Sequence, residues 1–113
     1  MARESLDNAL SEMMVLEIGA EYGEFAGLLM ASFGAEVVKL EPVSGARSRG
    51  VGPFFRPEGS EERSLHFERY NLAKKSVGLE LGRSGAPNIL ARLALKADAV
   101  SYTHLTLPTI LLV

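Results

Sequence analysis

Two short apolar runs with a helical pattern between them lie near the N-terminus, and this order limits the chain to few folds. The run 13–18 ends at Gly19, and the run 36–40 is rich in β-branched residues, so both are typical of buried strands. Between them, apolar residues at helical spacing predict a helix over about 25–33 that a glycine ends. Strand, helix and strand within about 28 residues indicate a βαβ unit, which requires parallel strands and a right-handed crossover.

The rest of the chain extends this arrangement. Residues 42–63 contain three of the five prolines, which predicts a long ordered loop or an excursion over the surface. After this loop, the sequence predicts a helical turn at 64–70, a strand at 76–81, a helix that begins near Pro87 and the opening of a strand at 97–100. We therefore expect an α/β fold, with a Rossmann-like parallel sheet of βαβ units and helices on its faces.

The composition excludes several classes of protein. The 113 residues include no cysteine, so disulfide frameworks and cysteine-based metal sites are excluded, and we expect no metal site. The apolar runs are far shorter than the roughly 20 residues that a membrane helix needs. The N-terminus as far as Leu16 lacks the basic start and apolar stretch of a secretory signal. We expect a cytoplasmic protein without a membrane partner.

The charge is unevenly distributed along the chain. The net charge of −2 combines −6 over residues 1–38, +3 over 39–75 and +1 over 76–113. A basic middle in an acidic chain favours a small phosphorylated ligand over nucleic acid, because duplex binding usually requires a net basic domain. A solvated surface of mixed charge is the alternative.

Residues 100–109, VSYTHLTLPT, closely resemble the in-frame translation of a transposase-type adapter from sequencing libraries. This interpretation predicts a native segment 1–99 and a non-native tail 100–113, and it makes the chain a fragment of a longer protein. The alternative is a native, β-rich tail. A non-native tail removes His104 as a catalytic candidate, and we expect His66 to be a half-buried structural residue.

The turn 19–23, with Glu41 after the second strand, permits a nucleotide-binding interpretation. A glycine turn lets backbone N–H groups approach a ligand at a helix N-terminus, and an acid that closes the second strand can bind ribose hydroxyls. This resembles the first motif of an S-adenosylmethionine-dependent methyltransferase and, less well, a dinucleotide fold. However, Glu21 replaces the central glycine, and G-x-G-x-x-G is missing. The methyltransferase-like domain is kept as an alternative.

Four sequence blocks cover more of the chain. They are Val15–Glu17 with Gly23–Gly27, close to A-G-P-F-A-G; Gly34–Pro42, close to G-A-E-V-I-K-V-E-P; Gly45–Arg49 with Gly52–Phe54; and Phe67, Asn71 and Lys74–Leu81, like F-x-x-x-N-x-N-K-R-S-V-x-L-D-L. In this order they resemble the N-terminal part of the family III CoA transferases, the CaiB/BaiF group of formyl-CoA and carnitine CoA transferases and 2-methylacyl-CoA racemases. Tyr22 and Glu24 depart from the first block. The resemblance implies an incomplete large domain of that family over residues 1–99.

The resemblance also implies a chemistry. Family members transfer CoA between an acyl-CoA thioester and a carboxylic acid through an aspartyl-acyl anhydride, bind no permanent cofactor, and form interlocked homodimers. A racemase-type member is the alternative. This chain has two aspartates, of which Asp7 is expected at the surface and Asp98 matches a structural position before a strand. We therefore predict no catalytic residue here and expect the fragment alone to be inactive.

The resemblance places contacts with CoA after the first three strands. The residues concerned are Glu21, Tyr22, Pro42, Leu79, Glu80, Leu81 and Gly82. Because CoA carries three phosphates, Arg49, Lys74 and Lys75 are phosphate candidates. Structural alternatives remain open for these residues, namely a packing ring for Tyr22 and a solvated strand start for the two lysines. For Glu41 we prefer the role of a structural acid at the end of a strand.

Overall fold

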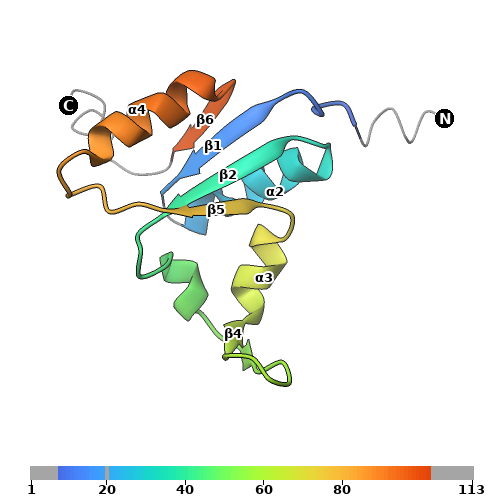
Figure 1. Cartoon of the computed structure of the whole chain (residues 1–113). Helices are drawn as coiled ribbons and strands as arrows, with labels where there is room; N and C mark the ends of the chain where they lie inside the picture. Colours follow the sequence, from blue (N-terminus) through green and yellow to red (C-terminus); the bar gives the residue numbers. More distant parts are fainter. Residues whose placement is uncertain (1–7, 20, 103–113) are drawn as a thin grey trace.

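The computed structural model describes residues 8–19 and 21–102 and contains one parallel sheet of four strands (Figure 1). The strands are β1 Met14–Ile18, β2 Glu36–Glu41, β5 Lys75–Gly78 and β6 Ala99–Tyr102, in the spatial order β5-β2-β1-β6. In the register, Val15 lies between Val37 and Ala99, and Val38 lies opposite Lys75. The predicted α/β class with parallel βαβ connections is confirmed.

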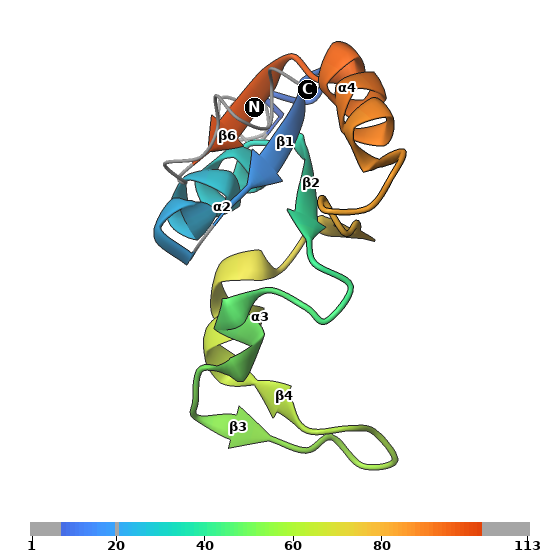
Figure 2. The same cartoon turned by 90° about the vertical axis from the view of Figure 1, so that its left-hand side faces the viewer.

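Two helices cover opposite faces of the sheet, as Figure 2 shows: α2 Glu24–Ser32 and α4 Ala86–Lys96. Side chains of a strand alternate between its faces. Leu16 of β1 therefore packs toward Leu90 of α4, whereas Val15 belongs to the apolar cluster beside Met30 of α2. Among the described residues, no helix is both long and apolar enough to cross a bilayer.

The segment between β2 and β5 forms the predicted excursion and extends away from the sheet (Figure 2). It contains the 3-10 helix η2 Arg47–Gly50, the short antiparallel strands β3 Phe54–Phe55 and β4 Arg63–Ser64, and the helix α3 Leu65–Asn71. The hydroxyl of Ser64 caps α3 by accepting a hydrogen bond of 3.0 Å from the backbone N–H of Phe67. The excursion is thus ordered, and a helix lies where the helical turn was predicted.

Two strand ends differ from the sequence prediction. Strand β5 ends at Gly78, because its partner β2 ends at Glu41 before a proline, which leaves residues 79–81 without a neighbouring strand. Strand β6 runs to Tyr102, three residues beyond the predicted native boundary, and pairs with β1. Residues 103–113, His104 among them, lie outside the described residues, so the adapter interpretation of the tail stays a prediction. Asp7 also lies outside the described residues.

Asp98 has the structural role expected for it. Its Oδ2 accepts a hydrogen bond of 2.8 Å from the backbone N–H of Met14, and its own N–H donates to the Met14 carbonyl at 2.8 Å. These two bonds align the start of β6 with the start of β1.

Candidate functional site: the carboxyl edge of the sheet

The strand order indicates which part of the sheet can bind a ligand. The chain passes from β1 outward through β2 to β5 and then returns to the other side of β1 to form β6. In open parallel sheets, ligands bind beyond the carboxyl ends of the strands at such a reversal. There, β1 continues through Gly19, whose φ of 120° favours glycine, into the 3-10 helix η1 Glu21–Gly23 and the start of α2.

Two of the predicted coenzyme residues lie on η1, directly after β1. The Tyr22 side chain is 85% exposed, so the alternative of a buried packing ring is wrong. The backbone of Glu21 opens η1, while its side chain lies outside the described part of the chain. Tyr22 therefore offers an aromatic face to solvent beside the strand reversal.

The other loop residues lie at the same edge of the sheet, after β2 and β5. Pro42 is exposed directly after β2. The Glu80 Oε1 accepts a hydrogen bond of 2.7 Å from the backbone N–H of Val43, which joins the two loops. Leu79 and Leu81 are half-buried and pack against the core beneath α4, and exposed Gly82 follows them. The structure thus brings together the segments that follow three consecutive strands of the sheet.

Glu41 and Arg49 form a tightly bonded pair at this edge. The Glu41 carboxylate is buried and accepts four hydrogen bonds: from Ala46 N at 2.7 Å, Arg49 Nε at 2.7 Å, Arg49 Nη2 at 2.6 Å and Ser76 Oγ at 2.5 Å. Burial by itself raises the pKa of this carboxyl, but the hydrogen bonds outweigh it and lower the pKa to about 2. Glu41 is therefore ionised at neutral pH and acts as the structural acid that we preferred.

The bonds to Glu41 leave part of the Arg49 guanidinium available. Its Cζ lies 3.9 Å from the centre of the Phe67 ring, so one face is covered by an aromatic side chain. The side chain is still 45% exposed, and Nη1 has no hydrogen-bond partner among the described residues. Arg49 is thus held in one orientation by Glu41 and Phe67 while part of its side chain stays exposed to solvent, which is compatible with contact to an anion.

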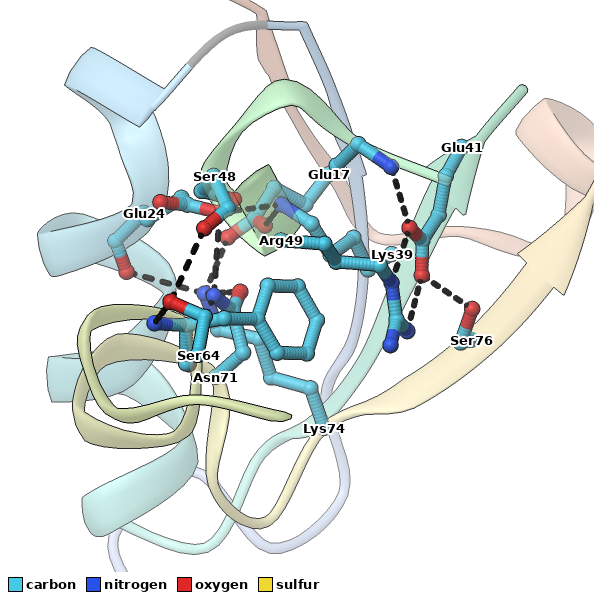
Figure 3. A network of polar contacts seen from close by, with 12 residues as sticks. Glu17, Glu24, Lys39, Glu41, Ser48, Arg49, Ser64, Asn71, Lys74 and Ser76 are labelled. Carbon is cyan, nitrogen blue, oxygen red and sulfur yellow. Dashed lines mark hydrogen bonds and ion pairs between the residues drawn. The ribbon is translucent and has the colours of Figure 1, made fainter. Parts of the chain in front are cut away.

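Four charged side chains form a buried cluster between the sheet and the excursion (Figure 3). Lys39 Nζ lies 2.8 Å from Glu17 Oε2 and 2.9 Å from Glu24 Oε2. Lys74 Nζ lies 2.8 Å from Glu17 Oε1, so the four charges alternate and cancel. Burial disfavours the charged form of a side chain, and the partner groups offset this cost to different degrees.

The pKa shifts of Lys39, Glu24 and Lys74 show how well the partners of these three groups offset the cost of burial. For Lys39, burial lowers the pKa, but the hydrogen bonds from its ammonium to Glu17 and Glu24 raise it above the ordinary value. For Glu24, burial raises the pKa, and hydrogen bonds from Ser48, Lys39 and Asn71 bring it below the ordinary value. For Lys74, burial dominates, and its pKa is lowered despite Glu17.

The cluster requires a close approach between β1 and α2 at Gly27. A methyl group added there would lie 1.9 Å from Glu17 Oε1 and 3.1 Å from Lys74 Cε. No side chain fits at this position while Glu17 keeps its two lysine partners, which explains a glycine inside a helix.

The profile of CoA-transferase family III matches residues 10–104. This chain belongs to that family. A subunit of succinyl-CoA:(R)-benzylsuccinate CoA-transferase from Thauera aromatica is 28% identical over 88 residues, which are 78% of this chain and 22% of the relative. Succinyl-CoA:mesaconate CoA-transferase from Haloarcula hispanica is 31% identical over 93 residues, 81% of this chain and 24% of the relative.

A solved structure supports the same assignment. A CAIB/BAIF family protein from Brucella suis superimposes with a TM-score of 0.77 and 28% identity over 85% of this chain and 26% of that protein. The membership that the four sequence blocks predicted is confirmed. This family III chain spans less than a quarter of the length of the two curated relatives described above.

Two of the predicted phosphate residues of this family III chain do not lie at the carboxyl edge. The Lys74 side chain is 2% exposed, and its ammonium donates to Glu17, to Asn71 Oδ1 at 3.1 Å and to the Glu24 backbone carbonyl at 2.9 Å. Lys75 opens β5 opposite Val38, about 10 Å before the strand ends, and pairs with Glu36 at 3.3 Å. We therefore leave both lysines out of the proposed coenzyme site.

The buried cluster of Glu17, Glu24, Lys39 and Lys74 was not predicted from the sequence. The available signal was a charged residue inside an otherwise apolar strand, Glu17 in β1 and Lys39 in β2. Strands of a parallel sheet are covered on both faces, so a charge there implies a buried partner. Within the described ranges, no group of three or more acidic or histidine side chains is arranged to bind a metal ion.

Proposed function

We propose that this chain is the N-terminal, coenzyme-binding part of an enzyme that transfers CoA between an acyl-CoA thioester and a carboxylic acid. This proposal rests on family membership and on one structural observation. At the carboxyl edge of the sheet lie Tyr22, Pro42, Arg49 and the loop 79–82. The relatives from Thauera aromatica and Haloarcula hispanica are named for reactions of succinyl-CoA, which supports an acyl-CoA donor.

The described residues suit the nucleotide end of CoA. The exposed Tyr22 ring can stack on the adenine base, and the free donors of Arg49 can bind a phosphate. Glu21, Pro42 and residues 79–82 contribute backbone groups and apolar surface. Such contacts tolerate changes of side chain, which agrees with the departures of this chain from the family blocks.

The reacting carboxylate is proposed to lie outside this chain. An aspartate attacks the thioester carbonyl and expels CoA thiolate, which leaves an aspartyl-acyl anhydride. The acceptor carboxylate attacks the aspartyl carbonyl of this anhydride and expels the donor acid as a free carboxylate, which leaves a new anhydride between the aspartate and the acceptor. The CoA thiolate then attacks the acceptor's carbonyl in the new anhydride, which releases the new thioester and regenerates the aspartate. Asp98 is bonded to Met14 and is unsuited to this role, so the chain alone is expected to be inactive. The full-length protein is proposed to be a homodimer.

The test is a pair of calorimetric titrations of the full-length protein, one with CoA and one with S-adenosylmethionine. We expect CoA to bind and S-adenosylmethionine not to bind. Binding of S-adenosylmethionine alone would refute the proposal in favour of the methyltransferase-like alternative. Exchange of the substrate's α-proton with deuterated solvent, without transfer of CoA to an acid, would instead indicate a racemase-type enzyme.

A further inference from the structure

We propose that Glu24 is a positioning residue that holds Arg49 in place for the coenzyme through its hydrogen bond to Ser48. This inference rests on the proposed function. It concerns a residue that departs from the family block, where a proline is usual, and that lies too deep in the fold to touch a ligand itself.

Four elements of the fold meet at one oxygen atom of Glu24. Glu24 lies at the start of α2, and its Oε2 accepts from Ser48 Oγ of η2 at 2.7 Å and from Asn71 Nδ2 of α3 at 2.9 Å. The same oxygen lies 2.9 Å from Lys39 Nζ of β2. Figure 3 shows these groups converging. A single carboxylate oxygen therefore joins two parts of the excursion to the sheet.

Ser48 directly precedes Arg49 in η2. Ser48 is fully buried and η2 is only four residues long, so a shift of one of these residues moves the other. Glu41 binds Arg49, and Glu24 binds Ser48, so η2 is held at two adjacent residues by carboxylates from two different elements. The Ser64 hydroxyl also donates to the Ser48 carbonyl at 3.2 Å, so loss of the Glu24–Ser48 bond leaves η2 attached but removes one of the contacts that fix the position of Arg49.

The charge of Glu24 also matters to the buried cluster. An uncharged acceptor could bond Ser48, but it would leave Lys39 and Lys74 with Glu17 as their only carboxylate partner in the cluster. A buried charge without a full counter-charge is costly. The carboxylate thus serves both the neutrality of the cluster and the position of η2, and the Ser48 hydroxyl separates these two roles experimentally.

The experiment measures the Kd for CoA of the full-length protein with Ser48→Ala, Arg49→Ala and both changes. We expect Ser48→Ala to raise the Kd about tenfold, the equivalent of one good hydrogen bond. In the Arg49→Ala background the same change should alter the Kd less than about twofold, because the two residues then act as one unit. The KM for the acyl-CoA should rise with Ser48→Ala while kcat stays unchanged.

The control is Ser60→Ala, an exposed serine in the loop between β3 and β4, which should leave the Kd unchanged. Circular dichroism confirms that each variant is folded; Ser48→Cys, of similar size but a weaker donor, replaces Ser48→Ala if the latter does not fold. The inference would be overturned by an unchanged Kd in Ser48→Ala. It would also be overturned if the fold-changes in Kd of Ser48→Ala and Arg49→Ala multiplied in the double variant. Either result would leave the proposed function intact. No binding of CoA by the wild type would overturn the proposed function and this inference with it.

Discussion

The two faces of the sheet differ in the kind of side chain that they bury. The buried part of the face beneath α4 is apolar, with Leu16, Ile18, Val38 and Leu40 packed in one cluster with Leu90. The face beneath α2 begins with Val15 and Val37, then changes at the next residue on the same face to Glu17 and Lys39, and ends with Glu41.

Because of this difference, one face contributes mainly to the stability of the fold and the other mainly to the positions of side chains and loops. Apolar burial stabilises the fold without fixing direction, whereas buried ion pairs contribute little net stability but hold groups at defined distances. The ionic half lies toward the carboxyl ends of the strands, where the proposed coenzyme site is. We infer that the α4 face supplies most of the folding energy and that the ionic half sets the geometry of the loops.

Replacing Lys39 with methionine should have the largest effect. Glu17 and Glu24 would then have only Lys74 as a cation, and we expect a loss of about 3–5 kcal/mol in the free energy of unfolding. Urea denaturation measures this loss. The matched control is Lys75→Met, which breaks an exposed pair with Glu36 and should cost less than about 1 kcal/mol. Equal losses in the two variants would show that burial of the pair is irrelevant.

Leu16→Ala tests the apolar face. The side chain has no exposed surface and lies at the centre of the cluster beneath α4, so we expect a loss of about 2–5 kcal/mol. Leu95→Ala, on the solvent side of α4 with an 86% exposed side chain, should change the stability by less than about 0.5 kcal/mol. If Leu16→Ala were harmless, the apolar face could not be the main source of stability.

Gly27→Ala tests the close approach that the ionic half requires. The added methyl would overlap the Glu17 carboxylate, and we expect a net loss of about 1–2 kcal/mol after the better helix propensity of alanine is included. Gly50→Ala is the control, because no atom lies within 4 Å of the added methyl group there. A stabilised Gly27→Ala protein would mean that Glu17 moves freely and that the cluster is not rigid.

The pH dependence of stability should report on Glu41. Its pKa in the folded protein is lowered to about 2, so the stability it contributes is present above its unfolded pKa and is lost as the pH falls toward 2. Because Arg49 is partly exposed, we expect a loss of only about 1–2 kcal/mol between pH 5 and 2. Glu41→Gln should flatten this part of the profile of urea midpoints. An unchanged profile in the variant would assign the acid sensitivity to other carboxylates.

Tyr22→Ala should have the smallest effect on stability, less than about 0.5 kcal/mol, because the ring is exposed. It should nevertheless raise the Kd for CoA about tenfold if the ring stacks on the base. Tyr22→Phe keeps the ring and should bind like the wild type. A normal Kd in the alanine variant would remove Tyr22 from the proposed site.

Periodicity and local blocks predicted the elements and the family, because strands, helices and their glycine ends are properties of neighbouring residues. The limits of β5 were less accurate, since they depend on where its partner β2 stops. The location of the residues that follow the strands could also be predicted from the sequence, because parallel strands end at the same edge of a sheet.

The sequence by itself thus determined the βαβ order and the family membership. Only the tertiary structure decided the roles of Lys74 and Lys75, which are adjacent in sequence but are buried and exposed, respectively. It also decided the partnership of Glu17 with Lys74, 57 residues away. Such choices depend on which elements pack together, because a charge can be buried only where distant parts of the chain supply its counter-charge.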